Sequence, residues 1–131
     1  MTDQEQTPRG GQEVVLVIED DPDVRESVCA MLQSLDYRVV DAPDIVGARA
    51  VLAEDNGVEV VLSDIILPGG VSGTAFVEEV RESHPALKFI LMTGYSADHL
   101  ERGGAVVAET VLLNKPFRIK QLADALHEAL A

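Results

Sequence analysis

The sequence contains no tryptophan and only one cysteine, Cys29, among its 131 residues. A single cysteine excludes a disulfide within the chain and is typical of proteins kept in a reducing compartment. No apolar run is long enough to span a bilayer, and the polar segment 1–12 lacks the basic and then apolar order of a signal peptide. We therefore expect a cytoplasmic protein whose residues 1–12 form a flexible tail.

Basic residues are scarce, because ten lysine and arginine residues stand against 23 aspartate and glutamate residues, for a formal net charge of −13. Proteins that bind nucleic acid directly contact its phosphates with clusters of Lys and Arg. The charge therefore argues against nucleic acid and anionic membranes as partners, and it leaves room for a cation or for a protein with a basic face. An acidic surface that only keeps a small protein soluble remains an alternative.

Apolar residues make up 47% of the sequence, which is enough for one core in a chain of this length. Short β-branched runs alternate with segments of helical period, and this order predicts a parallel α/β sheet with helices on both faces. We expect one domain, residues 13–131, with five strands and five helices. The expected strands are Val14–Ile18, Tyr37–Val40, Val58–Leu62, Leu87–Met92 and Thr110–Leu113.

Most of the segments between these strands, and the segment after the last one, carry apolar residues on one helical face. The fourth expected helix, Ser96–Gly103, is different because Leu100 is its one large apolar residue, so it is either a moving element or a poorly packed connector. The apolar faces of the others are Val24, Val28, Leu32 and Leu35; Ile45, Ala48 and Leu52; Phe76, Val77 and Val80; and Ile119, Leu122, Leu126 and Leu130.

Side chains that could carry chemistry stand where the expected strands end. A run of three acids, residues 19–21, follows the first strand, and Asp64, Thr93 and Lys115 follow the third, fourth and fifth. Ligands of open α/β sheets bind beyond the carboxyl ends of the strands, so these groups should converge. Carboxylates that converge at a partly buried edge either rise in pKa or bind a cation, and an oxygen-only cluster suits Mg²⁺.

Such a site predicts phosphoryl chemistry. Asp64 would attack phosphorus as a nucleophile, Lys115 and Mg²⁺ would neutralise charge, and Thr93 would donate a hydrogen bond to a phosphate oxygen. Each feature alone has a plainer explanation: a helix cap for residues 19–23, a turn residue for Asp64, and an ordinary surface lysine for Lys115. The predicted convergence of all of them favours the chemical interpretation.

These residues resemble the receiver domain of two-component response regulators, and the similarity runs from about residue 13 to the end. It implies the flavodoxin-like doubly wound (βα)5 sandwich, whose parallel strands have the order 2-1-3-4-5. The stretches "LPGGVSG" and "MTGYS" are similar to receivers associated with hybrid histidine kinases. The motifs that carry the resemblance are Glu19-Asp20, Asp64 with Pro68, Gly73, Thr93 and Lys115-Pro116.

The resemblance implies that Asp64 accepts a phosphoryl group from a histidine kinase or a histidine phosphotransfer protein. Thr93 is then the switch hydroxyl, and Lys115 is the phosphate-binding lysine in an expected cis bond to Pro116. Asp21 is left to cap the helix that Pro22 opens. The implied Mg²⁺ ligands are Glu19, acting through water, Asp20, Asp64 and the backbone carbonyl of Ile66.

Receiver domains catalyse their own phosphorylation and slow dephosphorylation, so no further enzyme activity is expected. The added charge would bias a two-state surface made of the fourth helix, fifth strand and fifth helix, where an effector or a second copy docks. Ile66 and Tyr95 stand near the expected attacking water and predict a long-lived phosphoryl group. Leu112 replaces the usual switch aromatic, so a switch would run through Thr93 and the fourth helix.

Several alternatives remain open at this point. A pseudo-receiver, which binds protein without phosphorylation, is supported by Glu19 and Leu112. A phosphatase is disfavoured by Ile66, where a second acid would be needed, and a flavodoxin by the acidic pocket and the few aromatic residues. The chain ends with the fifth helix, so we expect no output domain after it, and both a stand-alone regulator and the receiver of a larger kinase or regulator fit the sequence.

Overall fold

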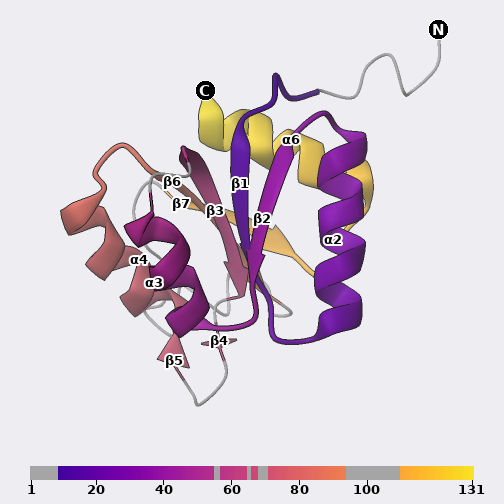
Figure 1. The fold of residues 1–131 in the computed structure, drawn as a ribbon. Helices are drawn as coiled ribbons and strands as arrows, with labels where there is room; N and C mark the ends of the chain where they lie inside the picture. The colour runs from indigo at the N-terminus through magenta and orange to yellow at the C-terminus, as the bar shows by residue number, and fades with distance from the viewer. Residues whose placement is uncertain (1–8, 55–56, 65, 68–70, 94–109) are drawn as a thin grey trace, which may run out of the picture.

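In the computed structural model, five parallel strands form one sheet in the order β2-β1-β3-β6-β7 (Figure 1). The structure describes residues 9–54, 57–64, 66–67, 71–93 and 110–131. In order along the chain the strands are second, first, third, fourth and fifth, so the predicted doubly wound topology is confirmed. They are β1 (Val14–Ile18), β2 (Arg38–Ala42), β3 (Val58–Asp64), β6 (Lys88–Thr93) and β7 (Thr110–Asn114).

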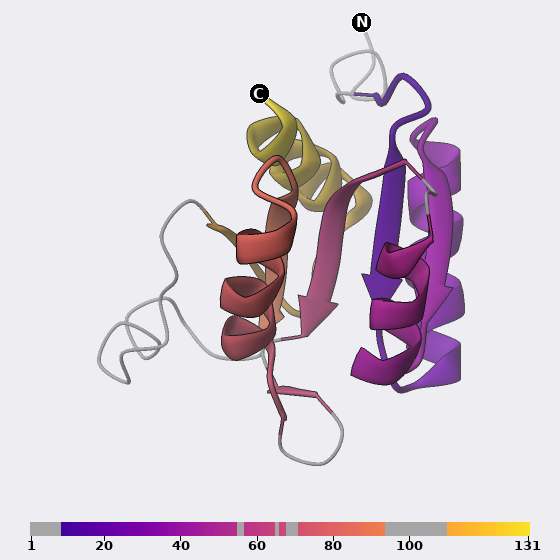
Figure 2. The ribbon, with the colours of Figure 1, turned by 60° about the vertical axis from the view of Figure 1, so that its left-hand side comes forward.

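Helices cover both faces of this sheet, as Figures 1 and 2 show from two sides. Helices α2 (Pro22–Ser34) and α6 (Ile119–Leu130) lie on one face, and α3 (Ile45–Ala53) and α4 (Gly73–Ser83) lie on the other. The expected fourth helix falls outside the described residues. None of the described helices has the length and apolar character needed to cross a membrane.

The central strands are apolar on both sides because each side packs against a helical layer. In β1, Val15 and Val17 join the core under α2 and α6, whereas Leu16 and Ile18 join the core under α3 and α4. All four side chains are fully buried. A strand buried on both faces is a continuous apolar run rather than an alternating one, which explains the pattern that the sequence presents.

The start of α2 is specified by the residue that precedes it. The Asp21 carboxylate accepts hydrogen bonds from the backbone N–H groups of Asp23 (2.9 Å) and Val24 (3.3 Å), and Pro22 occupies the first position of the helix. Both features satisfy or remove donors that have no partner inside the first turn. The predicted capping role of Asp21 is therefore confirmed.

Several strand boundaries differ from the prediction. Strand β2 begins at Arg38 rather than Tyr37 and runs to Ala42, and β3 and β6 extend as far as Asp64 and Thr93. Asp64 pairs with Met92 and Thr93 pairs with Asn114 in the parallel ladder. Because the ladder is made by backbone groups, it does not stop where the side chains become polar. Asp64 and Thr93 are thus the last residues of their strands and do not follow them.

Two further details depart from the sequence prediction. Ile119, which the pattern placed on the buried face of the last helix, is 41% exposed. It stands in the first turn of α6, where side chains lean towards the amino end of the helix, and the small residues Ala123 and Ala125 are buried further along the same helix. In addition, β4 (Ile66–Leu67) and β5 (Val71–Ser72) form a short antiparallel pair that was not predicted.

The described part of the N-terminal segment lies against the end of α2. The N–H of Gly10 donates to the carbonyl of Leu35 (2.7 Å), and the N–H of Gln12 donates to the carbonyl of Asp36 (2.9 Å). A Cβ atom on Gly10 would lie 2.6 Å from the ring of Tyr37, so the backbone passes close to that ring. Residues 1–8 of the expected tail fall outside the described residues.

Candidate functional site

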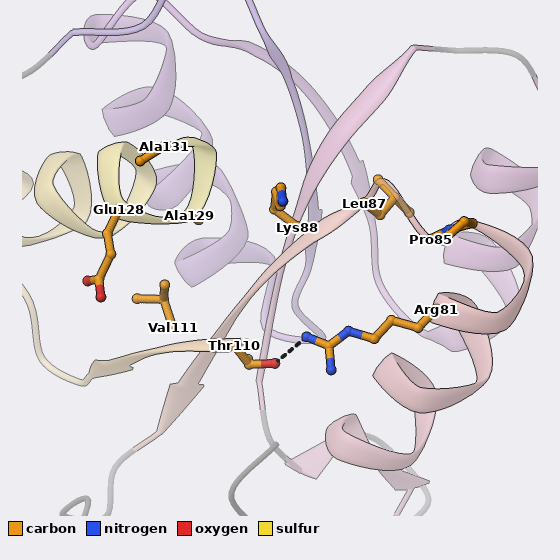
Figure 3. Close-up of a pocket in the computed structure, with 9 residues that line it drawn as sticks. All are labelled: Arg81, Pro85, Leu87, Lys88, Thr110, Val111, Glu128, Ala129 and Ala131. Atoms are coloured by element: carbon orange, nitrogen blue, oxygen red, sulfur yellow. Dashed lines mark hydrogen bonds between the residues drawn. The ribbon is translucent and has the colours of Figure 1, made fainter. Parts of the chain in front are cut away.

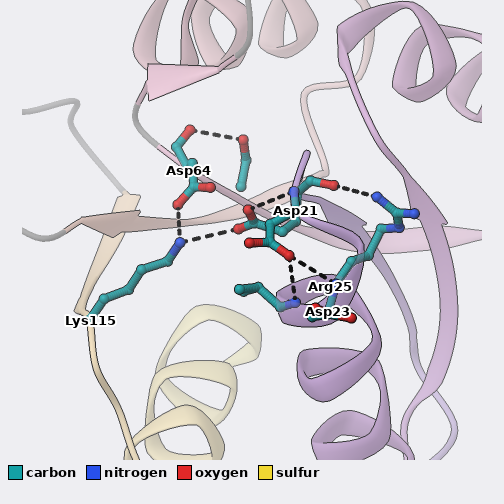
Figure 4. A network of polar contacts seen from close by, with 8 residues as sticks. Asp21, Asp23, Arg25, Asp64 and Lys115 are labelled. Carbon is teal, nitrogen blue, oxygen red and sulfur yellow. Dashed lines mark hydrogen bonds and ion pairs between the residues drawn. The ribbon is translucent and has the colours of Figure 1, made fainter.

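The carboxyl ends of three sheet strands bring acidic and basic side chains together (Figure 4). Glu19 directly follows β1, Asp64 is the last residue of β3, and Lys115 directly follows β7. In a parallel sheet these ends share one edge, so residues far apart in the sequence meet there. The convergence that the sequence predicted is present for these three residues.

Lys115 lies between the two acids. Its Nζ atom is 2.6 Å from Oδ1 of Asp64 and 3.1 Å from Oε2 of Glu19. The Glu19 side chain is 4% exposed and that of Asp64 15% exposed, so both ion pairs are partly shielded from water. A buried carboxylate needs a partner charge or a hydrogen bond, and one ammonium group supplies both acids.

Burial and ion pairing together shift two pKa values. Burial raises the pKa of Glu19 above its ordinary value, and the neighbouring Asp64 raises it further, although Lys115 and the N–H of Asp21 oppose part of the shift. Burial by itself lowers the pKa of Lys115, but Asp64 and Glu19 outweigh it and hold that pKa above its ordinary value. Lys115 therefore stays protonated, and the two acids share its charge.

Other side chains hold the backbone around these acids. The Nη1 atom of Arg25 donates to the carbonyl of Glu19 (2.8 Å), and its Nε atom donates to Asp41 (3.2 Å). The hydroxyl of Ser63, which is buried, donates to the carbonyl of Asp64 (3.0 Å). The supporting role of Ser63 was not foreseen, because a serine inside an apolar run carries no signal beyond its polarity.

The predicted metal ligands fit a hard cation by their chemistry. One carboxylate oxygen from each of Glu19, Asp20 and Asp64 lies within 4.8 Å of the others, and Asp20 is exposed to solvent. An all-oxygen donor set with one side open to water is what Mg²⁺ prefers. Ile66, whose backbone carbonyl is the fourth predicted ligand, is the first residue of β4, two positions beyond Asp64.

Thr93 and Lys115 are linked through the backbone of the neighbouring strands β6 and β7. Thr93 is buried at the end of β6, and its carbonyl accepts a hydrogen bond from the N–H of Lys115 (2.7 Å). The Lys115–Pro116 peptide bond is cis, as the resemblance implied. Leu112 packs at the margin of the core under α3 and α4, and Tyr95 lies outside the described residues.

A family model of the response regulator receiver domain matches residues 15–127 of the chain. The chain belongs to the response regulator receiver family. Receiver domains are signalling modules of two-component systems, interact with histidine kinases or phosphotransfer proteins, and generally use Mg²⁺ at an acidic pocket. The family predicted from the strand-end residues is thus confirmed.

Individual relatives agree with this assignment. The chain is 37% identical over 125 residues to the sensor kinase CckA of Brucella abortus. The aligned region covers 95% of this chain but only 13% of the length of that relative. The receiver domain of the hybrid histidine kinase CckA superposes with a TM-score of 0.71 at 25% identity, covering 90% of this chain and 99% of that one. The chemotaxis protein CheY4 of Vibrio cholerae superposes with a TM-score of 0.80 at 27% identity, covering 92% and 100%.

Proposed function

We propose that Asp64 accepts a phosphoryl group from the phosphohistidine of a histidine kinase or of a histidine phosphotransfer protein, in a reaction that requires Mg²⁺. The observation that carries this proposal is the pairing of Asp64 with Lys115 at 2.6 Å beside the carboxylates of Glu19 and Asp20. Membership of the receiver family supports it independently.

The reacting groups of the transfer are all supplied by the site and by the phosphohistidine donor. A carboxylate oxygen of Asp64 forms a bond to phosphorus as the bond from phosphorus to the donor imidazole breaks, and the imidazole keeps that electron pair and takes up a proton. Lys115 would neutralise charge on the incoming phosphate, and the Thr93 hydroxyl would donate to one of its oxygens. Bound Mg²⁺, held by Asp20, Asp64, the Ile66 carbonyl and Glu19 through water, would supply further charge neutralisation.

The test is to incubate the protein with Mg²⁺ and acetyl phosphate and to measure its intact mass. We expect one base-labile phosphoryl adduct that is absent in Asp64→Asn and after addition of a chelator. Asp36→Asn, which changes an exposed aspartate elsewhere on the surface, is the matched control and should keep the adduct. A folded protein that neither binds Mg²⁺ nor forms the adduct would instead be a pseudo-receiver.

The lifetime of the adduct is a separate prediction. Ile66 and Tyr95 replace groups that in other receivers stand near the attacking water, so hydrolysis of the aspartyl phosphate should be slow. We expect Ile66→Asn to speed the decay about tenfold, which corresponds to ~1.4 kcal/mol of activation free energy. The decay is followed by intact mass after removal of the donor. Rapid loss in the unchanged protein, at the same rate as in Ile66→Asn, would exclude this role for the side chain.

Phosphorylation would change a protein-binding surface at the fourth helix, the fifth strand and the fifth helix, for an effector or a second copy. Strand β7 and helix α6 are the described parts of this surface, and Lys115 joins β7 directly to the acidic site. Sedimentation of the protein with and without the acyl phosphate donor tests the version with a second copy. A larger sedimentation coefficient in the presence of the adduct, but not in Asp64→Asn, is the expected result.

A further inference from the structure

A hollow of about 650 Å³ lies at the opposite end of the sheet from the acidic site (Figure 3). It forms where α4 ends, where β6 and β7 begin, and where α6 ends. Leu87 and Val111 supply apolar wall, and Arg81 and Lys88 supply donors. The hollow thus combines cations and apolar surface in a chain whose net charge is −13.

The two cations of the hollow differ from most others in the described part of the chain, because they have no carboxylate partner there. Most basic side chains of the described residues lie within 4.0 Å of a carboxylate, whereas Arg81 and Lys88 do not. Arg38 and Arg118 share this property, but neither lines the hollow. The paired side chains are Arg9, Arg25, Arg49, Lys115 and Lys120.

The Arg81 guanidinium is held in place before any ligand arrives. Its Nη2 atom donates to Oγ1 of Thr110 (3.0 Å), and its central carbon lies 5.3 Å from the centre of the Phe89 ring. A guanidinium has five N–H groups in a fixed planar fork, and this is the one hydrogen bond it makes to the described residues. Donors therefore remain for a planar acceptor such as a carboxylate.

Glu128 limits what the hollow can accept. It is exposed and lines the α6 side of the hollow, and in Figure 3 its carboxylate lies away from Arg81. A long polyanion would meet this charge and the acidic surface around it, whereas a short segment with one carboxylate would reach the two cations. The Debye length at physiological salt is about 8 Å, so the local cations outweigh the distant acids at contact distance.

We propose that this hollow binds a short acidic and apolar peptide segment of a partner protein. One carboxylate of the segment would contact Arg81 and Lys88, and an adjacent apolar side chain would pack against Leu87 and Val111. The apolar walls favour such a segment over a bare inorganic anion, because that anion has nothing to bury against them.

The probe is the blocked peptide acetyl-Ala-Leu-Glu-Val-Ala-amide, titrated into the nitrogen-15-labelled full chain at 0.15 M salt and followed by amide chemical shifts. Saturable shifts centred on Leu87, Lys88, Thr110 and Val111 are expected, with a dissociation constant of about 0.1–1 mM, typical of one weak contact site. The same peptide with glutamine in place of glutamate should bind at least about fivefold more weakly.

Three variants separate the proposal from general charge effects. Lys88→Gln should weaken binding of the glutamate peptide about threefold to tenfold, whereas Arg38→Gln, which removes an equally unpaired cation outside the hollow, should leave it unchanged. Glu128→Gln should strengthen binding about twofold to fivefold. All three side chains are exposed, so their loss should not prevent folding, and the amide spectrum verifies this.

Four results would overturn the proposal. The first is equal binding of the glutamate and glutamine peptides, and the second is an effect of Lys88→Gln no larger than that of Arg38→Gln. The third is displacement of the peptide by an equal concentration of inorganic phosphate, since the hollow would then be a simple anion site. The fourth is the absence of any saturable shift up to 5 mM peptide, a concentration roughly five times the largest dissociation constant expected.

Discussion

The two ends of the sheet treat charge in opposite ways. At the carboxyl end, Glu19 and Asp64 are shielded from water and share the ammonium group of Lys115 at 3.1 and 2.6 Å. At the amino end, Arg81 and Lys88 line an open hollow with no carboxylate partner among the described residues. One end pairs its shielded acids with a lysine of the same chain, and the other has cations without a carboxylate partner among the described residues.

The difference shows where a charge is needed for the stability of the fold and where it can remain unpaired. A buried carboxylate without a partner costs several kcal/mol, so the carboxyl end is stable as described because Lys115 is there. An exposed cation is solvated by water and can stay unpaired at little cost. Removing a charge should therefore affect stability strongly at the carboxyl end and weakly at the amino end.

The largest effect is expected from Lys115→Met, which leaves Glu19 and Asp64 close together without a cation. We expect the free energy of unfolding in urea, measured at pH 8 with a chelator present, to fall by about 2–4 kcal/mol. The loss should be smaller at pH 5, because protonation of one acid relieves the repulsion. Lys120→Met, which breaks an exposed pair with Asp124, is the control and should cost at most about 0.5 kcal/mol. Equal losses of unfolding free energy in the two variants would show that the shielded pairs of Lys115 stabilise the fold no more than an exposed ion pair does.

A smaller effect is expected in the pH dependence of stability, through Glu19. Because the folded state raises the pKa of Glu19 above its ordinary value of 4.5, the folded protein binds more protons than the unfolded chain just above that pH. The free energy of unfolding should therefore fall as pH rises from 4.5 through the raised pKa. In Glu19→Gln this part of the fall should disappear, as urea denaturation at a series of pH values would reveal. An unchanged slope would mean that Glu19 titrates alike in both states.

The smallest effects are expected at the amino end. Lys88→Gln should change the free energy of unfolding by less than about 0.5 kcal/mol, since the side chain is exposed and has no partner among the described residues. Arg81→Gln should cost about 1 kcal/mol, because it removes the hydrogen bond to Thr110 and the contact with the Phe89 ring. Urea denaturation measures both. A fall of more than about 2 kcal/mol in the free energy of unfolding for Lys88→Gln would contradict the difference in stability proposed between the two ends of the sheet.

Much of the fold could be predicted from the sequence because its signals are local. The apolar run of β1, the cap formed by Asp21 and Pro22, and the apolar face of α4 each depend on neighbouring residues. The strand-end acids and Lys115 could be predicted to meet because parallel strands present their carboxyl ends at one edge. Their order along the chain also predicted the receiver family, which the family match confirms.

Other features could not be predicted because they depend on residues distant in the sequence. The pairing of one lysine with two acids depends on how β7 places Lys115 beside Asp64 and beside Glu19, which is 96 positions away. The 41% exposure of Ile119 depends on how α6 packs against the rest of the fold, and helical periodicity does not contain that information. The extension of β3 through Asp64 depends on its pairing with β6.

The sequence by itself determined the alternation of strands and helices, the parallel sheet, and the set of reactive side chains at its carboxyl edge. It could do so because hydrophobic period and capping chemistry act over a few residues. The tertiary structure decided which charges are shielded and paired, as with Glu19 and Lys115, and which remain open, as with Arg81 and Lys88. Burial and pairing depend on how distant elements pack against one another, and no local pattern carries that information.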